Sequence, residues 1–185
     1  MEEYQRIEEQ IRELRKQMVD LLKSQGPEEA FDYDLKDQDG NSVKLSQLFG
    51  DKQDLIVVHN MGRNCPYCTL WADGLNGLTD HFQNRAGFVV VSPDEPHAQK
   101  EFALSRGWRF KMVSAAGSSF TKDMGFEVNG DYWPGFSTFR LEEGQIRRIA
   151  RDYFGPGDFY CSVWHMFDLL KDGAGEWQPR FEYAR

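Results

Sequence analysis

Residues 55–68 read LIVVHNMGRNCPYC and pass from a compact apolar run, through a short polar loop, to a pair of cysteines. Such an apolar run is typical of a central strand that is covered on both faces. Because Cys65 and Cys68 are three positions apart, they share one face of a helix that we expect to run from Pro66 to about Phe82. A Cys-x-x-Cys pair between a buried strand and a helix indicates redox chemistry.

The rest of the chain alternates between expected strands and helices. We expect strands at 31–35, 87–92, 110–114, 136–141 and 145–150, and a short strand that ends near residue 45. Helices are expected at 97–106, at 118–124 and from 157 to 170. In the last helix the residues expected to face the core are Tyr160, Val163, Trp164, Phe167 and Leu170. This order predicts an α/β fold with helices on both faces of a sheet. It divides the chain into an N-terminal amphipathic helix (1–25), a main domain (26–172) and an aromatic tail (173–185).

The N-terminal helix carries an apolar stripe with alternating steps of three and four residues. Its members are Tyr4, Ile7, Ile11, Leu14, Met18 and Leu21. The spacing suits a coiled-coil seam, but the stripe is short for one. We therefore expect a helix laid across its own domain, and the alternative is packing on a second copy in a homodimer. In the tail, Trp177, Phe181 and Tyr183 are expected to dock on another surface, for which a second subunit is one candidate.

Composition excludes several classes of protein. The 185 residues carry 22 basic and 30 acidic side chains, a net charge of −8, with no basic patch of the kind that binds nucleic acid. No apolar run resembles a signal peptide or is long enough to span a bilayer, so we expect a cytoplasmic protein without membrane partners. Three cysteines are too few for a disulfide scaffold, which favours a dithiol at rest.

The expected chemistry is thiol–disulfide exchange. Cys65 lies at a helix N-terminus, where the helix dipole and the free N–H groups lower a thiol pKa, and Pro66 suits the first turn. Cys65 is the expected nucleophile and Cys68 the expected resolving thiol. A zinc site would need two more ligands, whereas Cys161 is isolated and the histidines are scattered along the chain. We therefore expect no metal and no cofactor, and we interpret Cys161, Trp71 and Trp164 as packing residues.

Residues 31–50 and 89–96 resemble peroxiredoxins and their thioredoxin-like relatives. The chain resembles more closely a bacterial thioredoxin-like family of unassigned function, in which a leading helix precedes a strand ending in His, a Cys-Pro-x-Cys motif and Trp-Ala-Asp. These motifs are His59, residues 65–68 and residues 71–73 here. The resemblance spans roughly residues 2–170 and implies a thioredoxin-like fold: a central mixed sheet flanked by helices, with an N-terminal helix added.

The resemblance also implies roles for individual residues. His59 takes the place of a buried acid that handles the proton of the second cysteine in thioredoxins, so it is either a proton relay or a strand-end histidine satisfied by hydrogen bonds to the backbone. Pro134 is either the cis-proline that faces the cysteine pair or a turn proline, in which case Phe136 or Ser137 takes that place. Independently of the resemblance, Arg63, Asn64 and Tyr67, like Pro66, are expected to border the site because they lie next to Cys65 in the sequence.

Three functions follow, in order of preference. The first is a thiol–disulfide oxidoreductase that acts on a protein or small-molecule disulfide and draws on an unknown electron donor. The second is an antioxidant thiol peroxidase. However, the chain lacks the Pro-x-x-x-Thr-x-x-Cys motif of peroxiredoxins. With Cys65 as the motif cysteine, Val58 and Gly62 stand at the Pro and Thr positions, and with Cys68 these positions are Met61 and Cys65. The third is a binding module that kept the fold without turnover.

Overall fold

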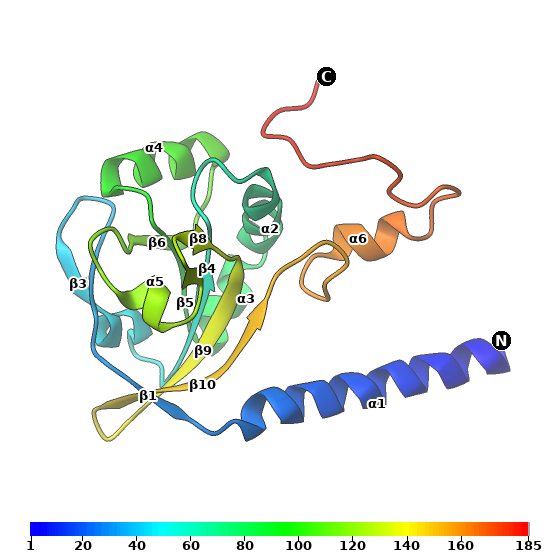
Figure 1. The fold of residues 1–185 in the computed structure, drawn as a ribbon, viewed down its shortest axis with the longest axis horizontal. Helices are drawn as coiled ribbons and strands as arrows, with labels where there is room; N and C mark the ends of the chain where they lie inside the picture. The colour runs from blue at the N-terminus through cyan, green and yellow to red at the C-terminus, as the bar shows by residue number, and fades with distance from the viewer. Residues whose placement is uncertain (185) are drawn as a thin grey trace.

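A computed structural model describes residues 1–184, which form a mixed eight-stranded sheet with helices on both faces (Figure 1). The strand order is β1-β10-β9-β4-β5-β6-β2-β3, and β4, β5 and β6 run parallel at its centre. The strands are β1 (Glu28–Ala30), β2 (Asp34–Lys36), β3 (Ser42–Lys44), β4 (Asp54–His59), β5 (Gly87–Ser92), β6 (Lys111–Ser114), β9 (Gly135–Glu142) and β10 (Gln145–Tyr153), with β7 (Glu127–Val128) and β8 (Asp131–Tyr132) in a separate ribbon. The helices are α1 (Glu2–Ser24), η1 (Leu45–Phe49), α2 (Pro66–Asn76), α3 (Thr79–Arg85), α4 (Pro96–Arg106), α5 (Phe120–Asp123) and α6 (Ser162–Phe167).

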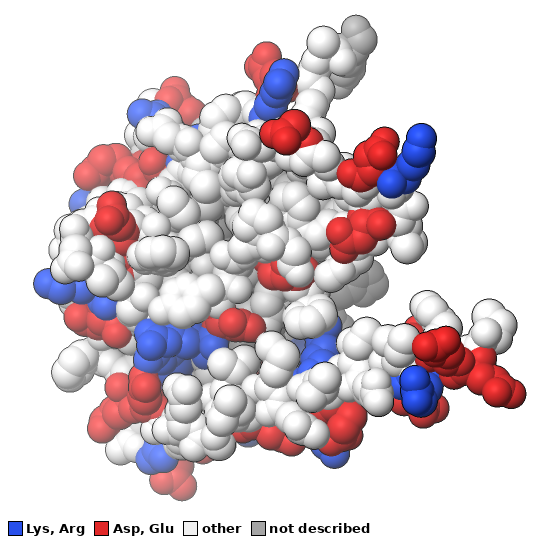
Figure 2. All heavy atoms as spheres, turned by 45° about the vertical axis from the view of Figure 1, so that its right-hand side comes forward, with Lys and Arg blue, Asp and Glu red and all other residues white. Residues whose placement is uncertain are grey.

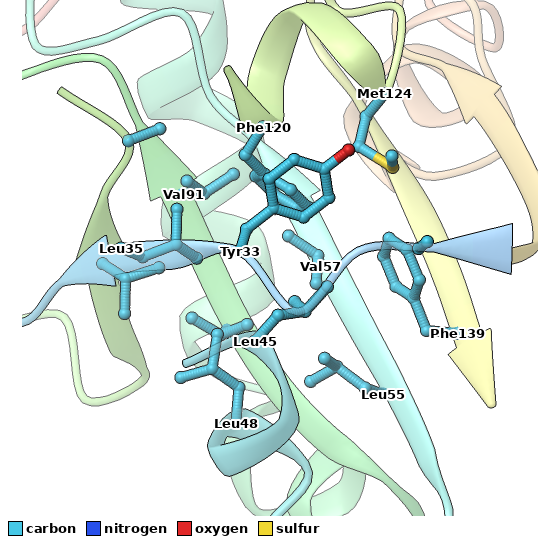
Figure 3. Packing of buried hydrophobic residues seen from close by; sticks show 14 of the residues in the cluster. Tyr33, Leu35, Leu45, Leu48, Leu55, Val57, Val91, Phe120, Met124 and Phe139 are labelled. Carbon is cyan, nitrogen blue, oxygen red and sulfur yellow. The ribbon is translucent and has the colours of Figure 1, made fainter. Parts of the chain in front are cut away.

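Alternation along β4 divides the core into two layers. Leu55 and Val57 point into one apolar cluster, which also includes Phe120 (Figure 3). Residues of η1 and α5 pack against these strand side chains and complete the cluster. Val58 points the opposite way, into a cluster that α2 and α4 cover with Ala72 and other small side chains. Because successive side chains of a strand face opposite sides of a sheet, a nearly continuous apolar run is what a strand buried on both faces requires. The expected α/β class with a central mixed sheet is confirmed.

Several expected boundaries are wrong. Residues 31–33 are not in a strand and instead connect β1 to β2, which pair with different partners. The helix expected from Pro66 to about Phe82 is two helices, because Gly77 ends α2 and a new helix begins at Thr79. The last helix is only six residues long, and Leu170, expected in the core, is 56% exposed beyond its end. The β7–β8 ribbon was not expected.

α1 is helical over the expected residues, but the expectation that it lies across its own domain is wrong. None of its residues is buried. In Figure 1 it extends along one side of the molecule, with its N-terminus far from the sheet. The Arg15 guanidinium lies 4.8 Å from the centre of the Phe159 ring, and Leu22 lies beside residues 148–151 of β10. The helix is therefore anchored at its C-terminal half and bare along its apolar stripe.

The aromatic tail docks on its own chain. The Trp177 ring lies 4.9 Å from the Phe167 ring and 5.9 Å from the Trp164 ring, centre to centre. Further along, the backbone oxygen of Phe181 accepts a hydrogen bond from Arg106 Nη1 at 2.7 Å. The tail thus covers α6 and reaches α4. Among residues 1–184, no helix combines the length and the apolar character needed to cross a membrane.

Candidate active site

The loop between β4 and α2 is held by backbone hydrogen bonds at the carboxyl ends of two parallel strands. The Asn60 N–H donates to the Val91 oxygen at 2.9 Å, and Asn60 Oδ1 accepts the Gly62 N–H at 2.8 Å. The Cys65 N–H in turn donates to the Gly62 oxygen at 3.2 Å. These bonds place Cys65 at the start of α2, at the edge of the sheet where open α/β folds bind their ligands.

Cys65 is the N-cap residue of α2. Its backbone is extended, with φ −102° and ψ 103°, and its Sγ accepts the Cys68 N–H at 3.0 Å. Pro66 follows as the first helical residue, where its missing N–H costs no hydrogen bond. The pKa of Cys65 is lowered to about 7, chiefly by a hydrogen bond from the Cys68 thiol and also by the backbone N–H groups of Cys68 and Tyr67, against the opposing effect of burial. A half-buried thiolate is therefore abundant at neutral pH.

Cys68 lies one turn further along α2 and is only 3% exposed. The hydrogen bond to Cys65 and burial both raise its pKa, so it stays a thiol while Cys65 ionises. Both cysteines are free. The two sulfurs thus differ in accessibility and in acidity, and the difference has the sense that the spacing predicts.

Asp94, just beyond β5, holds this loop from the other side. Its Oδ2 accepts the Arg63 N–H at 2.9 Å and the Ser92 hydroxyl at 3.0 Å. Gly62 has a φ of +106°, and a Cβ there would lie 3.1 Å from the same oxygen. Sequence reasoning did not assign Asp94 a place at the site, although its position directly after a buried parallel strand was the available signal.

His59 does not meet the cysteines in this arrangement. It lies on the face of β4 opposite α2, where its Nε2 is 3.1 Å from the Ser137 hydroxyl and its ring stacks 3.9 Å from the Phe126 ring. Burial lowers the pKa of His59 to about 3, with a smaller contribution from the Arg148 charge. The imidazole is neutral at pH 7 and has no hydrogen bond to either sulfur. Its Nδ1 is buried without a hydrogen-bond partner among residues 1–184, so His59 is not the fully satisfied histidine of the second expectation either.

Of the other expected neighbours, Arg63 and Asn64 lie beside Cys65, whereas Pro134 lies between β8 and β9. The side chains of Arg63 and Asn64 are exposed beside Cys65, with no hydrogen bond or ion pair to any side chain within residues 1–184. The Trp133–Pro134 peptide bond is trans, and the Pro134 oxygen accepts the Phe154 N–H at 2.9 Å, which is the turn-proline expectation. Arg140 pairs with Asp54 at 3.0 Å, at the opposite end of β4 from the cysteines.

A family model described as a bacterial protein of unknown function (DUF899) matches residues 2–185. The chain belongs to this family. The family match covers both α1 and the docked tail of this DUF899 protein, so both belong to the region that defines the family.

Curated relatives of this DUF899 protein are peroxiredoxins. The chloroplastic peroxiredoxin Q of Populus jackii is 30% identical over 129 residues, which cover 67% of this chain and 59% of that protein. The chloroplastic peroxiredoxin Q of Gentiana triflora is 27% identical over 129 residues, with coverages of 67% and 58%. The matched region thus spans less than two thirds of the length of these relatives.

Solved structures of the same class share the fold. Peroxidoxin BcpB from Mycobacterium tuberculosis is 24% identical with a TM-score of 0.57, over 69% of this chain and 84% of that one. The bacterioferritin comigratory protein of Xanthomonas campestris is 23% identical with a TM-score of 0.52, over 66% and 81%. The thioredoxin-like, peroxiredoxin-related fold inferred from the sequence is confirmed.

A cluster of aromatic side chains that includes Tyr67 lies next to the cysteines in the DUF899 chain. Tyr67 lies between the cysteines in sequence, and its ring is 6.2 Å from that of Trp71 and 6.3 Å from that of Trp164. Trp71 and Trp164 are buried as expected, and Cys161 is buried in the same cluster. Within residues 1–184, no group of three His, Cys, Asp or Glu side chains is placed to hold a metal ion.

Proposed function

We propose that this protein is a thiol-dependent oxidoreductase that reduces a hydroperoxide, with Cys65 as the attacking thiolate and Cys68 as the resolving thiol. The observation that carries the proposal is the pairing of a half-buried sulfur, whose pKa is lowered to about 7, with a buried sulfur one turn away that remains protonated. The similarity to peroxiredoxin Q supports a peroxide as the oxidant. Disulfide reduction, preferred from the sequence alone, becomes the second candidate.

The chemistry needs two steps at the sulfurs. The Cys65 thiolate attacks one peroxide oxygen, so that an S–O bond forms, the O–O bond breaks, and the leaving alkoxide or hydroxide takes up a proton to give an alcohol or water. Cys65 is then a sulfenic acid. The Cys68 thiol attacks the Cys65 sulfur, so that an S–S bond forms, the S–O bond breaks, and water leaves with the Cys68 proton. The peroxide is reduced by two electrons, and the dithiol is oxidised to a disulfide.

A second substrate must return the electrons. Two thiol groups of an external donor, either a dithiol or two separate thiols, reduce the Cys65–Cys68 disulfide by exchange through a mixed disulfide. The half-buried Cys65 is the sulfur open to this attack, because Cys68 is only 3% exposed.

The donors that polarise the peroxide differ from those of the peroxiredoxin motif. Gly62 stands where that motif has a threonine, so no hydroxyl is available there. The Arg63 side chain is exposed next to Cys65 and has no partner among the side chains of residues 1–184. We assign the guanidinium of Arg63 the task of donating a hydrogen bond to the peroxide, in addition to the N–H groups at the start of α2.

The second candidate, disulfide reduction, has an observation of its own. Cys65 and Cys68 lie within one helical turn, with Pro66 between them, which lets a mixed disulfide on Cys65 be resolved without any change in the fold. The missing threonine hydroxyl also weakens the case for a fast peroxidase.

The deciding measurement is a pair of second-order rate constants for the reduced protein, one with hydrogen peroxide and one with a protein disulfide. A peroxide rate at least about a hundredfold above that of a free thiol of similar pKa supports the first candidate. Arg63→Ala should lower that rate by about tenfold and leave the disulfide rate unchanged, while Arg63→Lys keeps part of it. A peroxide rate equal to that of the free thiol, with a fast disulfide rate, would favour the second candidate.

Three cysteine variants complete the test. Cys65→Ser should abolish both reactions, and Cys161→Ser, which changes the buried packing cysteine, should abolish neither. Cys68→Ser should accumulate a sulfenic acid on Cys65 after peroxide, detectable by mass and by a sulfenic-acid trap. If both rates are slow in the wild-type protein, the fold serves binding and not turnover.

A further inference from the structure

The apolar stripe of α1 is not covered by any part of residues 1–184 that the structure describes. Its six residues, Tyr4, Ile7, Ile11, Leu14, Met18 and Leu21, are 45–67% exposed. A 23-residue helix is about 35 Å long and only marginally stable by itself in water. A helix of this length with a bare apolar stripe therefore needs a covering surface.

We propose that α1 pairs with α1 of a second copy of this chain as an antiparallel coiled coil about a twofold axis. The stripe occupies alternating a and d positions of three heptads, the pattern that coiled-coil seams require. In an antiparallel pair every a residue meets a d residue of the other copy. The three kinds of layer are Tyr4 with Leu21, Ile7 with Met18 and Ile11 with Leu14, and each occurs twice by symmetry. No apolar residue of the stripe is left unmatched.

Charges beside the seam select the antiparallel orientation. Glu8 and Arg15 are the two charged residues directly after a d position, and in the antiparallel pair Glu8 of one copy lies next to Arg15 of the other, twice. In a parallel pair, Glu3 of one copy would lie next to Glu8 of the other, twice, and the like charges would repel. The antiparallel pair therefore gains two attractive contacts where the parallel pair has two repulsive ones.

The charge distribution along α1 points the same way. In Figure 2 acidic side chains gather at the free end of the projecting helix. The acidic residues of the helix are Glu2, Glu3, Glu8, Glu9, Glu13 and Asp20, and the basic ones are Arg6, Arg12, Arg15, Lys16 and Lys23. Residues 2–12 sum to −2 and residues 13–24 to +1, so an antiparallel partner brings opposite ends together.

A membrane surface fits α1 less well than a second copy. Helices that lie on bilayers carry mostly Lys and Arg on their polar face, because membrane surfaces are anionic. The polar face of α1 mixes both signs with a net charge of −1. Binding to anionic vesicles is nevertheless an outcome that the experiment must detect.

The anchoring of α1 leaves the seam open. Arg15 contacts Phe159, and Leu22 lies against residues 148–151. Both Arg15 and Leu22 directly follow a d position, so they lie on one flank of the stripe. The six residues of the stripe remain 45–67% exposed. Arg15 can therefore contact the Phe159 ring of its own domain and also lie next to Glu8 of the second copy at the edge of the seam.

The test is sedimentation velocity of the reduced full-length protein over the micromolar range, with variants that change charge at matched positions. The wild-type protein should be a dimer. Glu8→Arg places two like-charge pairs beside the seam and should weaken dimerisation by about tenfold. Glu9→Arg makes the same charge change on the outer face and is the control, with no expected effect. The alkylation rate of Cys65 checks that each variant is folded.

A mixture of two variants tests the pairing itself. Glu8→Arg and Arg15→Glu chains should each dimerise poorly, but together they should form a heterodimer at least as tight as the wild-type dimer, because both flanking pairs become attractive again. A full-length protein that stays monomeric would overturn the proposal. So would equal effects of Glu8→Arg and Glu9→Arg, a tighter dimer with Glu8→Arg, which indicates parallel helices, or a monomer that sediments with phosphatidylserine vesicles.

Discussion

Asp94 lies against Gly62, so that a side chain at that position of the loop presenting Cys65 would require Asp94 to shift. A Cβ on Gly62 would lie 3.1 Å from Asp94 Oδ2, the oxygen that also accepts the Arg63 N–H at 2.9 Å. The φ of +106° at Gly62 lies in a region that residues with a side chain rarely adopt. The threonine of the peroxiredoxin motif is therefore incompatible with this loop as it stands.

Restoring that threonine should harm the protein. Gly62→Thr should lower the free energy of unfolding by about 1–3 kcal/mol, since it adds backbone strain and a clash with Asp94. It should also slow peroxide reduction. Urea unfolding and the peroxide rate check both effects. Gly117→Ala is the matched control, because its φ is +78° but nothing lies within 4 Å of its Cβ. A Gly62→Thr protein that is stable and faster would contradict this account of the loop.

The acidity of Cys65 should depend on the side chain at position 68. Alkylation of the reduced protein over a pH series should label Cys65 first, with half of its full rate at a pH of about 7. Cys68→Ala removes the hydrogen bond that contributes most to the shift, so it should raise the pKa of Cys65 toward that of an ordinary thiol. Cys68→Ser keeps a donor and should leave the pKa lowered. Equal values in the two variants would show that the helix N-terminus acts alone.

His59 should make the fold sensitive to acid. Its pKa is lowered from 6.5 to about 3, so the unfolded chain binds a proton between these values that the folded chain does not. The stability that this neutral histidine contributes is complete above pH 6.5 and is lost as the pH falls toward 3. At pH 5 the loss is about 2 kcal/mol relative to pH 7.5.

The control for this pH dependence is His59→Gln, which keeps a partner for Ser137 but does not titrate. The difference in unfolding free energy between pH 7.5 and pH 5 should be about 2 kcal/mol smaller in this variant. Its rates of thiol chemistry at pH 7 should stay within a few-fold of the wild-type rates, because His59 has no hydrogen bond to either sulfur. A loss of a hundredfold or more in a folded variant would restore the proton-relay hypothesis.

The docked tail should stabilise the end of the molecule near the cysteines. Trp177→Ala removes the contacts with Phe167 and Trp164, so amide hydrogen exchange in α6 should accelerate by tenfold or more. Tyr183→Ala is the control, because the Tyr183 ring is exposed and its hydroxyl bonds only locally, to the Arg180 N–H. Unchanged exchange in the Trp177 variant would mean that α6 is stable without the tail.

The sequence by itself determined the features that depend on local pattern. The apolar run 55–59 could only be a strand buried on both faces, and the strand–loop–helix context of Cys65 and Cys68 was readable because helix spacing and capping are local properties. The relative acidity of the two thiols followed from the same local geometry, since Cys65 caps the helix and Cys68 lies a turn inside it. The stripe of α1 was readable as a helix for the same reason.

Tertiary structure alone decided what each of these elements touches. The periodicity of α1 is compatible with its own domain and with a second copy, and only the position of the helix outside the core makes the second copy the partner that we propose. The distance in sequence between His59 and Cys65 suggested a proton relay, but alternation along β4 turns the imidazole to the other face, toward Ser137 and Phe126. Asp94 meets the loop at Gly62 because two parallel strands end side by side, and no local pattern records this relation between residues 32 positions apart. Contacts between distant segments depend on how the sheet is assembled, and this is why the site's supporting residues became visible only in the folded chain.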